Sequence, residues 1–545
     1  MREGLREDIV IGPPGTGKTT YGVRQIHRAV EAFGAGAVLV ASFTRAAATE
    51  IAERAAFADT ETANVGTLHS LCFRALGGDF KIADEKIDDW SEFATSQGCP
   101  QFALRGKYQA DAGDLAQGEG IVDEGQRLSM TMGLLRAQMV PVAQWPEDVA
   151  RFGGLWFEWK REGGLTDYTD LIELALSDLE FPPGGATVGF YDEVQDFKPL
   201  EMAVLRRWAK HMDRIVLIGD ADQTLYEWSG ASPRVFLDAR AGAESVRVLA
   251  QSYRVPRAVH AVAQAMIGRV EDRIAAEYRP REDDGMVRQT AATWRSPERL
   301  LPFLDKDLAE GRSVMVLASC SFLLAPTIAM LRRGGYPFGN RWRETRGDWN
   351  PLAERKGALR AADRLLAFLR QRREVFGDVA RTWTVADVAA FTAHLSSAVL
   401  QRGAKRKFEG MAKTAGGDAV QIAEVFDLTS LRAAAAGDVD WFLANLLPDR
   451  RRPYEYVAAV LRRGGAAALS VKDKPPLVSV GTIHSVKGAE ADCVYLLPDL
   501  SMQGGERYAK RVGRDEVHRM FYVGMTRARQ RLVLASPAGA GAVQW

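Results

Sequence analysis

The sequence is poor in cysteine, in long apolar runs and in net charge. Its 545 residues contain four cysteines, none in the Cys-x-x-Cys spacing that zinc sites and iron–sulfur clusters favour, and such sparse cysteines fit a reducing compartment. No apolar run reaches the roughly 18–20 residues that a membrane-spanning helix needs. The first residues, MREGLRED, lack the apolar centre of a secretory signal. We therefore expect a cytoplasmic protein without a membrane segment.

The charge balance excludes a strongly basic surface. The formal net charge is +1, so binding to nucleic acid would depend on local basic patches. Lysine is scarce, with 16 residues among the 71 Lys and Arg. Arginine forms bidentate contacts with phosphate and stacks on bases, although a GC-rich genome would produce the same bias. A chain of this length exceeds one hydrophobic core and predicts about two to four domains.

A glycine-rich loop near the start of the sequence indicates a nucleoside triphosphate. Residues 9–11 (IVI) predict a short buried strand, and GPPGTGKTT after them fits the phosphate-loop pattern GxxxxGK[ST]. This loop consists of Gly12, Pro13, Pro14, Gly15, Thr16, Gly17, Lys18, Thr19 and Thr20. Its backbone N–H groups can turn toward phosphate oxygens, Lys18 can reach the β- and γ-phosphates, and the Thr19 hydroxyl can bind Mg²⁺. Kinases, GTPases, transporters and motors all share such a loop.

Two further predicted strands end in polar residues. Residues 187–191 lead into DEVQD, and residues 214–218 lead into GDADQ. A carboxylate at a strand end can hold Mg²⁺ through water, which fits Asp192, and the adjacent Glu193 can orient or deprotonate the attacking water. Gln223 is a candidate sensor of the γ-phosphate. By itself DEVQD would fit a surface turn equally well, but the phosphate loop favours the catalytic interpretation.

Two aromatic residues follow Gln223 among glycine, serine and glutamate. Tyr226 and Trp228 would usually be core residues, but this polar setting favours exposure. An exposed Trp228 would offer a stacking platform for a base, worth about 1–3 kcal/mol.

Read in order, these blocks resemble the superfamily 1 helicases of the UvrD/Rep/PcrA type. Stretches similar to the family's motifs are ASFTRAAATEI (41–51), GTLHSL (66–71), LTDYTDL (165–171), DEVQD (192–196), GDADQTLYEWSGA (219–231), QSYR (251–254), VGTIHSVKGAE (480–490) and FYVGMTRAR (521–529). So many ordered matches do not arise by chance. The resemblance implies an α/β fold with two RecA-like parallel-sheet P-loop cores, each carrying a mostly helical inserted subdomain.

In such helicases ATP binds in a cleft between the two cores. The resemblance implies that Tyr253 stacks on adenine, that Glu490 belongs to the ATP site, and that Arg254 and Arg527 reach the γ-phosphate. Such arginine fingers are worth about 10³–10⁵ in rate, whereas without the ordered motifs a surface salt bridge would be the default for both. The cofactors implied are ATP and Mg²⁺, with Thr19 and Asp192 at the metal. Residues 1–11 contain no Gln of the kind that grips adenine in the family, so more of the recognition would fall to Tyr253.

The resemblance also implies a path for a single DNA strand. The residues on this path would be Phe43, Thr67, His69, Trp228, Thr482, His484 and Ser485. The two aromatic side chains would stack on bases, while the others would contact the sugar–phosphate backbone without reading sequence. For His69 and His484, a histidine packed at a strand end is the alternative interpretation. Glu227 and Ser229 stand where the family often has Arg, so one contact to the DNA backbone is expected to be weaker.

The motifs divide the chain into four predicted segments. The first core would comprise residues 1–76 and 165–250, with a helix-rich inserted subdomain at 77–164. The second core would comprise residues 251–341 and 475–545, with a second inserted subdomain at 342–474. Short basic clusters in that second insertion would by default be solvated helix faces.

These features predict an ATP-dependent DNA helicase that translocates on single-stranded DNA and acts at single-strand/duplex junctions. The 3′-to-5′ direction and an association with the nucleoid follow from the resemblance alone. One alternative is a translocase that displaces proteins from DNA with little unwinding. Another is a non-motor ATPase that binds nucleic acid and uses ATP as a switch. An RNA track also fits, because backbone contacts discriminate weakly unless the 2′-OH is read.

Overall fold

The computed structural model describes residues 5–42, 45–54, 64–104, 111–119, 123–354, 357–371, 382–470, 475–511 and 513–545. The chain divides into two compact units. The first comprises Met1–Gln289, Ala318–Ser321 and Thr482–Trp545, and the second comprises Thr290–Leu317 and Phe322–Gly481. Within the described ranges, no helix is both long and apolar enough to cross a membrane.

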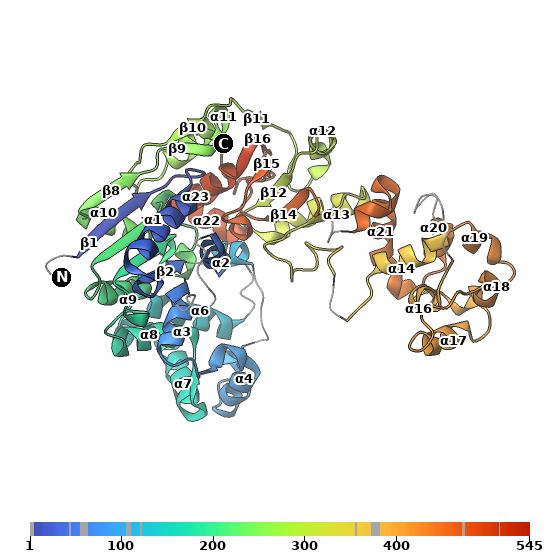
Figure 1. Ribbon diagram of the computed structural model, residues 1–545, viewed down its shortest axis with the longest axis horizontal. Helices are drawn as coiled ribbons and strands as arrows, with labels where there is room; N and C mark the ends of the chain where they lie inside the picture. The colour runs from blue at the N-terminus through green and yellow to red at the C-terminus, as the bar shows by residue number, and fades with distance from the viewer. Residues whose placement is uncertain are drawn as a thin grey trace. The chain divides into compact units, whose positions relative to one another are not determined.

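A six-stranded parallel sheet organises the N-terminal part of the first unit (Figure 1). Its spatial order is β3 (Val65–Thr67), β2 (Val38–Ser42), β6 (Val188–Asp192), β7 (Arg214–Gly219), β1 (Arg6–Ile11) and β8 (Ser245–Val248). The register pairs Ser42 with Asp192 and Ile11 with Gly219. The carboxyl ends of β2, β6, β7 and β1 therefore meet at one edge, where ligand sites of open parallel sheets form.

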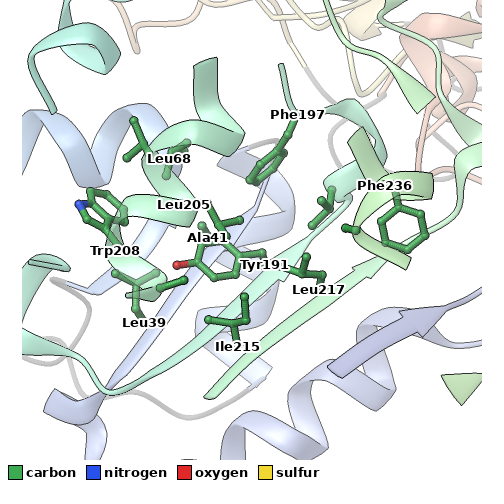
Figure 2. Close-up of a cluster of buried hydrophobic side chains, with 14 of the residues drawn as sticks. Leu39, Ala41, Leu68, Tyr191, Phe197, Leu205, Trp208, Ile215, Leu217 and Phe236 are labelled. Atoms are coloured by element: carbon green, nitrogen blue, oxygen red, sulfur yellow. The ribbon is translucent and has the colours of Figure 1, made fainter. Parts of the chain in front are cut away.

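Helices cover both faces of this sheet because successive strand residues point to opposite sides. One face packs on α1 (Lys18–Phe33) and α2 (Arg45–Arg54), and its buried strand residues include Val10, Val40, Phe190 and Val216. The other face packs on α3 (Leu68–Ala75), α8 (Tyr168–Asp178), α9 (Pro199–Ala209) and α10 (Pro233–Gly242). Figure 2 shows this second cluster, in which the Trp208 and Phe236 side chains surround strand residues such as Tyr191 and Leu217.

A separate aromatic core lies in the segment between β3 and β6. The helices that build it are α4 (Ile87–Ser96), α6 (Glu124–Ala137) and α7 (Glu147–Gly163). The ring of Trp90 makes edge-on contacts with Phe152, Trp156 and Trp159 at centroid distances of 5.3, 5.0 and 5.6 Å. The short helix α5 (Ala112–Ala116) and the strand pair β4 (Lys81–Ile82) and β5 (Leu165–Thr166) complete this segment.

A second six-stranded sheet contains the strands of the C-terminal part. Its order is β11 (Met286–Gln289), β16 (Ala528–Leu534), β15 (Ala491–Leu496), β12 (Val314–Ala318), β14 (Val478–Thr482) and β13 (Phe338–Gly339). In the first unit, the helices α11 (Arg257–Ile267), α22 (Met502–Ala509) and α23 (Arg514–Met525) accompany it, together with the strand pair β9 (Gln251–Pro256) and β10 (Arg279–Arg281).

The second unit is mostly helical. Its helices are α12 (Leu301–Ala309), α13 (Ala325–Arg333), α14 (Ala361–Phe368), α16 (Val385–Thr392), α17 (Ala404–Met411), α18 (Ile422–Val425), α19 (Leu431–Ala435), α20 (Val439–Ala444) and α21 (Arg451–Gly464). Helices α14, α16 and α20 contribute the buried rings of Phe368, Phe391 and Phe442, and those of Phe368 and Phe442 lie at a centroid distance of 4.6 Å.

The two parallel sheets with their helices confirm the predicted α/β fold class with two RecA-like cores. The strands expected before the phosphate loop and before the two polar loops are β1, β6 and β7. The boundaries of the four predicted segments remain predictions.

Candidate functional site

The loop between β1 and α1 is shaped to receive phosphate. Gly15 and Gly17 have φ values of 74° and 80°, left-handed values that glycine adopts without steric cost. A Cβ on Gly12 would lie 2.1 Å from Cγ of Lys18, so glycine leaves the space that the lysine stem occupies. Lys18 Nζ donates to the Gly12 carbonyl at 2.8 Å. The turn is completed by Pro13, Pro14 and Thr16, and Thr19 and Thr20 lie in the first turn of α1.

Asp192 ends β6 beside this loop, and within the described ranges one of its carboxylate oxygens is not hydrogen-bonded. Its side chain is buried, and Oδ1 has no hydrogen-bond partner among the residues that the structure describes. Burial, together with the neighbouring Glu193, raises the pKa of Asp192 to about 7. Thr19 lines the same small cavity as Asp192. One carboxylate and one hydroxyl are a suitable protein contribution to a Mg²⁺ site, because water molecules and substrate phosphates usually supply most of the ligands of this ion.

Glu193 is held as a carboxylate between two lysines. Lys18 Nζ lies 3.8 Å from Oε1 and Lys487 Nζ lies 3.6 Å from Oε2, while Gln195 Nε2 donates to Oε2 at 2.5 Å. Burial alone would raise the pKa of Glu193, but the two lysines outweigh it and hold the pKa below its usual range. Glu193 also has a φ of 56°, which is rare outside glycine. The carboxylate is therefore charged at neutral pH and fixed beside the phosphate loop.

Gln223 connects the phosphate loop to Arg527. Gln223 Nε2 donates to Asp220 Oδ2 at 2.8 Å and lies 3.4 Å from the Gly12 carbonyl. Arg527 Nη2 donates to Gln223 Oε1 at 3.3 Å. Burial, followed by the positive charge of Arg254, lowers the pKa of Arg527 to about 9. Arg527 also donates to the Val523 and Ala489 carbonyls, so these three acceptors are all neutral, and an incoming phosphate anion would be a stronger partner for the guanidinium.

A second group of predicted ATP-site residues, Arg254, Tyr253 and Glu490, also lies at this loop. Arg254 Nε donates to Glu490 Oε2 at 2.6 Å, and a Cβ on Gly15 would lie 2.4 Å from Cβ of Arg254. The pKa of Glu490 is lowered because Arg254 outweighs the effect of burial. The backbone N–H of Tyr253 donates to the Gly15 carbonyl at 2.8 Å, and the Tyr253 side chain is 72% exposed. The predicted ATP-site residues thus gather around one loop.

The predicted backbone-contact residues include a repeated local structure. The pattern GTxHS occurs at 66–70, at the end of β3, and at 481–485, at the end of β14. In each copy the Ser N–H donates to the Thr Oγ1 at 3.2 Å. In each copy the Ser Oγ also donates to the Thr carbonyl at 2.8 Å. Both copies therefore present a threonine and a histidine from the same kind of turn.

The two copies differ in their surroundings. Thr67 and His69 are partly exposed, and His69 Nδ1 lies 3.7 Å from Glu201 Oε1. In the second copy Thr482, His484 and Ser485 are buried. There His484 Nε2 lies 3.0 Å from the Leu225 carbonyl, and Thr482 Oγ1 hydrogen-bonds to Asp111 Oδ1. These contacts of His484 are those expected of a histidine packed at a strand end, which was the alternative to a contact with the DNA backbone.

Trp228 is half-buried rather than fully exposed. Its ring lies 6.5 Å from that of Tyr226, and Nε1 has no partner among the described residues. Trp228 also lines a cavity of about 510 Å³ together with Met130 and Leu134 of α6. Phe43, the other predicted stacking residue, lies outside the described residues.

Several contacts at the site were not predicted. Lys487 forms ion pairs with the buried Asp196 and with Glu193. Lys487 and Asp196 both lie within the motifs quoted above, and their opposite charges were the sequence signal for this contact. Ser252 Oγ and Tyr278 Oη each donate to the Pro14 carbonyl at 2.9 Å. Tyr278 lies in a segment without a recognisable pattern, so the sequence carried no signal for it.

Comparisons with known proteins agree with this arrangement. Residues 6–229 match a family model described as an AAA domain, and residues 461–537 match the UvrD-like helicase C-terminal domain. The chain is 24% identical to the ATP-dependent DNA helicase UvrD2 of Mycobacterium tuberculosis (strain ATCC 25618 / H37Rv), over 97% of this chain and 77% of that protein. It is 24% identical to DNA helicase II of Escherichia coli (strain K12), over 48% of this chain and 38% of that protein. The chain belongs to the UvrD/Rep type of superfamily 1 helicases.

Proposed function

We propose that this chain is an ATP- and Mg²⁺-dependent DNA helicase that moves 3′ to 5′ along single-stranded DNA and separates strands at junctions. The observation that carries the proposal is the meeting of two sets of side chains at one phosphate loop. Lys18, Asp192, Glu193 and Gln223 come from the first sheet, while Arg254 and Arg527 come from segments associated with the second. The direction of movement rests on the family resemblance.

The residues divide the chemistry of ATP hydrolysis among them. Lys18 and the loop N–H groups hold the β- and γ-phosphates. Mg²⁺, bound near Thr19 and Asp192, would neutralise phosphate charge. Glu193 orients the attacking water and accepts its proton, because its low pKa keeps it ionised at neutral pH. Arg254 and Arg527 stabilise the charge that develops on the transferred phosphoryl group, and Gln223 senses its presence. Tyr253 stacks on adenine with its exposed ring.

The nucleic-acid path would run over the partly exposed Thr67 and His69, with Phe43 and Trp228 stacking on bases. Thr482, His484 and Ser485 are buried in this structure, so their contacts to the strand require the segment around them to open. Short polar side chains and loop N–H groups hold the phosphates without reading sequence. Binding is then sequence-independent and weakens with salt. Opening and closing of the ATP site moves the strand past the stacking residues, which couples hydrolysis to translocation.

ATPase and strand displacement, measured together on 3′-tailed, 5′-tailed and blunt duplexes, test the proposal. We expect DNA-stimulated ATPase with every tail and unwinding of the 3′-tailed duplex. Unwinding only from a 5′ tail would contradict the direction. ATPase without unwinding, together with removal of a bound protein block, would indicate a protein-displacing translocase. ATPase that no nucleic acid stimulates would contradict the motor itself.

A further inference from the structure

A buried ion pair joins the loop after β7 to helix α23. Arg519 on α23 donates from Nη1 to Glu227 Oε1 at 3.0 Å and from Nη2 to the Asp272 carbonyl at 2.6 Å. The Arg519 side chain is 2% exposed and that of Glu227 is 25% exposed. Arg519 Nε has no partner among the residues that the structure describes. Loss of Glu227 would remove the carboxylate to which this buried guanidinium is hydrogen-bonded, which is strongly unfavourable.

Glu227 lies in the loop that also contains the predicted base-stacking residue Trp228 and the predicted γ-phosphate sensor Gln223. Glu227 directly precedes Trp228 and follows Gln223 by four residues in the same loop. Arg519 lies eight residues before Arg527, which follows the end of α23. The loop therefore contacts this segment at two points, Gln223 with Arg527 and Glu227 with Arg519. Two contacts about two helical turns apart on one segment restrict rotation of the loop against the helix.

The charges at this contact are matched in this chain. An arginine at position 227 would face Arg519 with a like charge, whereas the glutamate forms a charge-assisted hydrogen bond with it. The loop thus gains a contact to α23.

We infer that Glu227 and Arg519 are positioning residues that couple strand binding at Trp228 to the placement of Arg527 at the γ-phosphate. This inference rests on the proposed function. A base stacked on Trp228 fixes the loop, the ion pair transmits that position to α23, and Arg527 is held for hydrolysis. Without the pair, ATP hydrolysis continues at its basal rate but responds poorly to DNA.

A double-mutant cycle tests the coupling. Glu227→Ala, Arg519→Ala and the double variant are assayed for ATPase kcat with and without oligo(dT), and for the oligo(dT) concentration that gives half-maximal stimulation. We expect each single variant to lose about tenfold of the stimulated kcat, in the range of ordinary coupling free energies, while the basal rate stays within about twofold. The stimulated kcat of the double variant should be no lower than that of the less active single variant, because the two substitutions remove the same contact. Glu227→Gln, which keeps an acceptor oxygen, should retain more stimulation than Glu227→Ala.

Arg234→Ala is the matched control. It removes an exposed ion pair with the carboxylate of Asp272, at 2.8 Å, beside the Asp272 carbonyl that accepts from Arg519, and it leaves the Glu227–Arg519 hydrogen bond in place. Stimulation in this control should match the wild-type protein. If an alanine variant loses its thermal unfolding transition, Glu227→Gln and Arg519→Lys give the same comparison. Full stimulation in the pair variants, or losses that add in the double variant, would overturn the inference while the proposed function stands. A wild-type ATPase that DNA does not stimulate would overturn the proposed function, and the coupling with it.

Discussion

Arg527 and Gln223 share a hydrogen bond of 3.3 Å, and the same Gln223 amide lies 3.4 Å from the Gly12 carbonyl of the phosphate loop. One neutral side chain therefore touches both the loop that would hold the phosphates and the arginine that would stabilise their transfer. Any change in the phosphates that displaces Gln223 also removes an acceptor from Arg527.

Replacing Arg527 with lysine should abolish most of the turnover. Lysine keeps the charge but not the forked donors, which matter at a planar phosphoryl group. We expect DNA-stimulated kcat to fall by about 10³-fold or more, within the range known for arginine fingers. Steady-state ATP hydrolysis measures the effect. Arg514→Lys, at the start of the helix that Arg527 follows and bonded to the Tyr508 carbonyl, is the control and should change kcat little. An Arg527→Lys enzyme with normal kcat would contradict the assigned role.

Glu193→Gln should separate ATP binding from hydrolysis. The amide keeps the size of the side chain but cannot accept the proton of the attacking water. We expect kcat to fall by about 10²–10⁴-fold while the affinity for ATP changes little. Phosphate release gives the rate, and binding of a fluorescent ATP analogue gives the affinity. The exposed Glu244→Gln is the control, and equal losses in both variants would show that charge at position 193 is not the cause.

Lys18→Ala should lose ATP hydrolysis but keep strand binding. The lysine amine contacts the Gly12 carbonyl and lies 3.8 Å from Glu193 Oε1, and both of these groups belong to the predicted ATP site. We expect kcat to fall by about 10²–10³-fold, as for removal of one preorganised cationic donor. Fluorescence anisotropy with labelled oligo(dT) should give a dissociation constant close to that of the wild-type protein. A parallel loss of strand binding would mean that the substitution disturbs the fold.

Trp228→Ala should weaken binding of single-stranded DNA. Loss of one stacked base is worth about 1–3 kcal/mol, or roughly 5–150-fold in Kd. Anisotropy at a fixed salt concentration measures the change. Phe33→Ala removes an aromatic side chain that is 61% exposed near the end of α1 and should leave Kd unchanged. Equal affinity of the Trp228→Ala and wild-type proteins would exclude stacking at this position.

The second unit should lose stability in mild acid through His394. Tyr454 Oη lies 2.8 Å from His394 Nδ1. Burial, with the positive charges of Arg364 and Arg450, lowers the pKa of His394 to about 4. The folded state therefore binds fewer protons than the unfolded state between pH 4 and the ordinary value of 6.5, and unfolding free energy rises with pH across this window. The contribution is complete above pH 6.5 and is lost as the pH falls toward 4.

Thermal unfolding at about pH 5 and about pH 7.5 checks this prediction. The difference in Tm between the two conditions should be smaller for His394→Gln than for the wild-type protein. The charged groups facing His394 are Arg364, Lys405, Asp449 and Arg450, and they remain in the variant. An identical difference in both proteins would assign the acid sensitivity to other groups.

The sequence predicted the features whose chemistry is local. The phosphate loop needs Gly15 and Gly17 at fixed offsets from Lys18, and Asp192 and Gln223 follow apolar strands directly, so pattern and spacing locate them. Contacts between distant segments escaped prediction. Arg519 and Glu227 are 292 residues apart, and no local pattern indicates that they meet. The half-buried state of Trp228 escaped for the same reason, because α6 supplies part of its surroundings.

The backbone of Glu193 carries a consequence for engineering this protein. An L-residue in the left-handed region costs about 1–2 kcal/mol, and glycine avoids most of that penalty. Glycine at this position would relieve the strain, but it would also remove the carboxylate that lies between the largely buried Lys18 and Lys487, and that loss outweighs the relief. The strained backbone and the group expected to activate water are therefore retained together, and a thermostability screen that varies position 193 needs an ATPase assay alongside it.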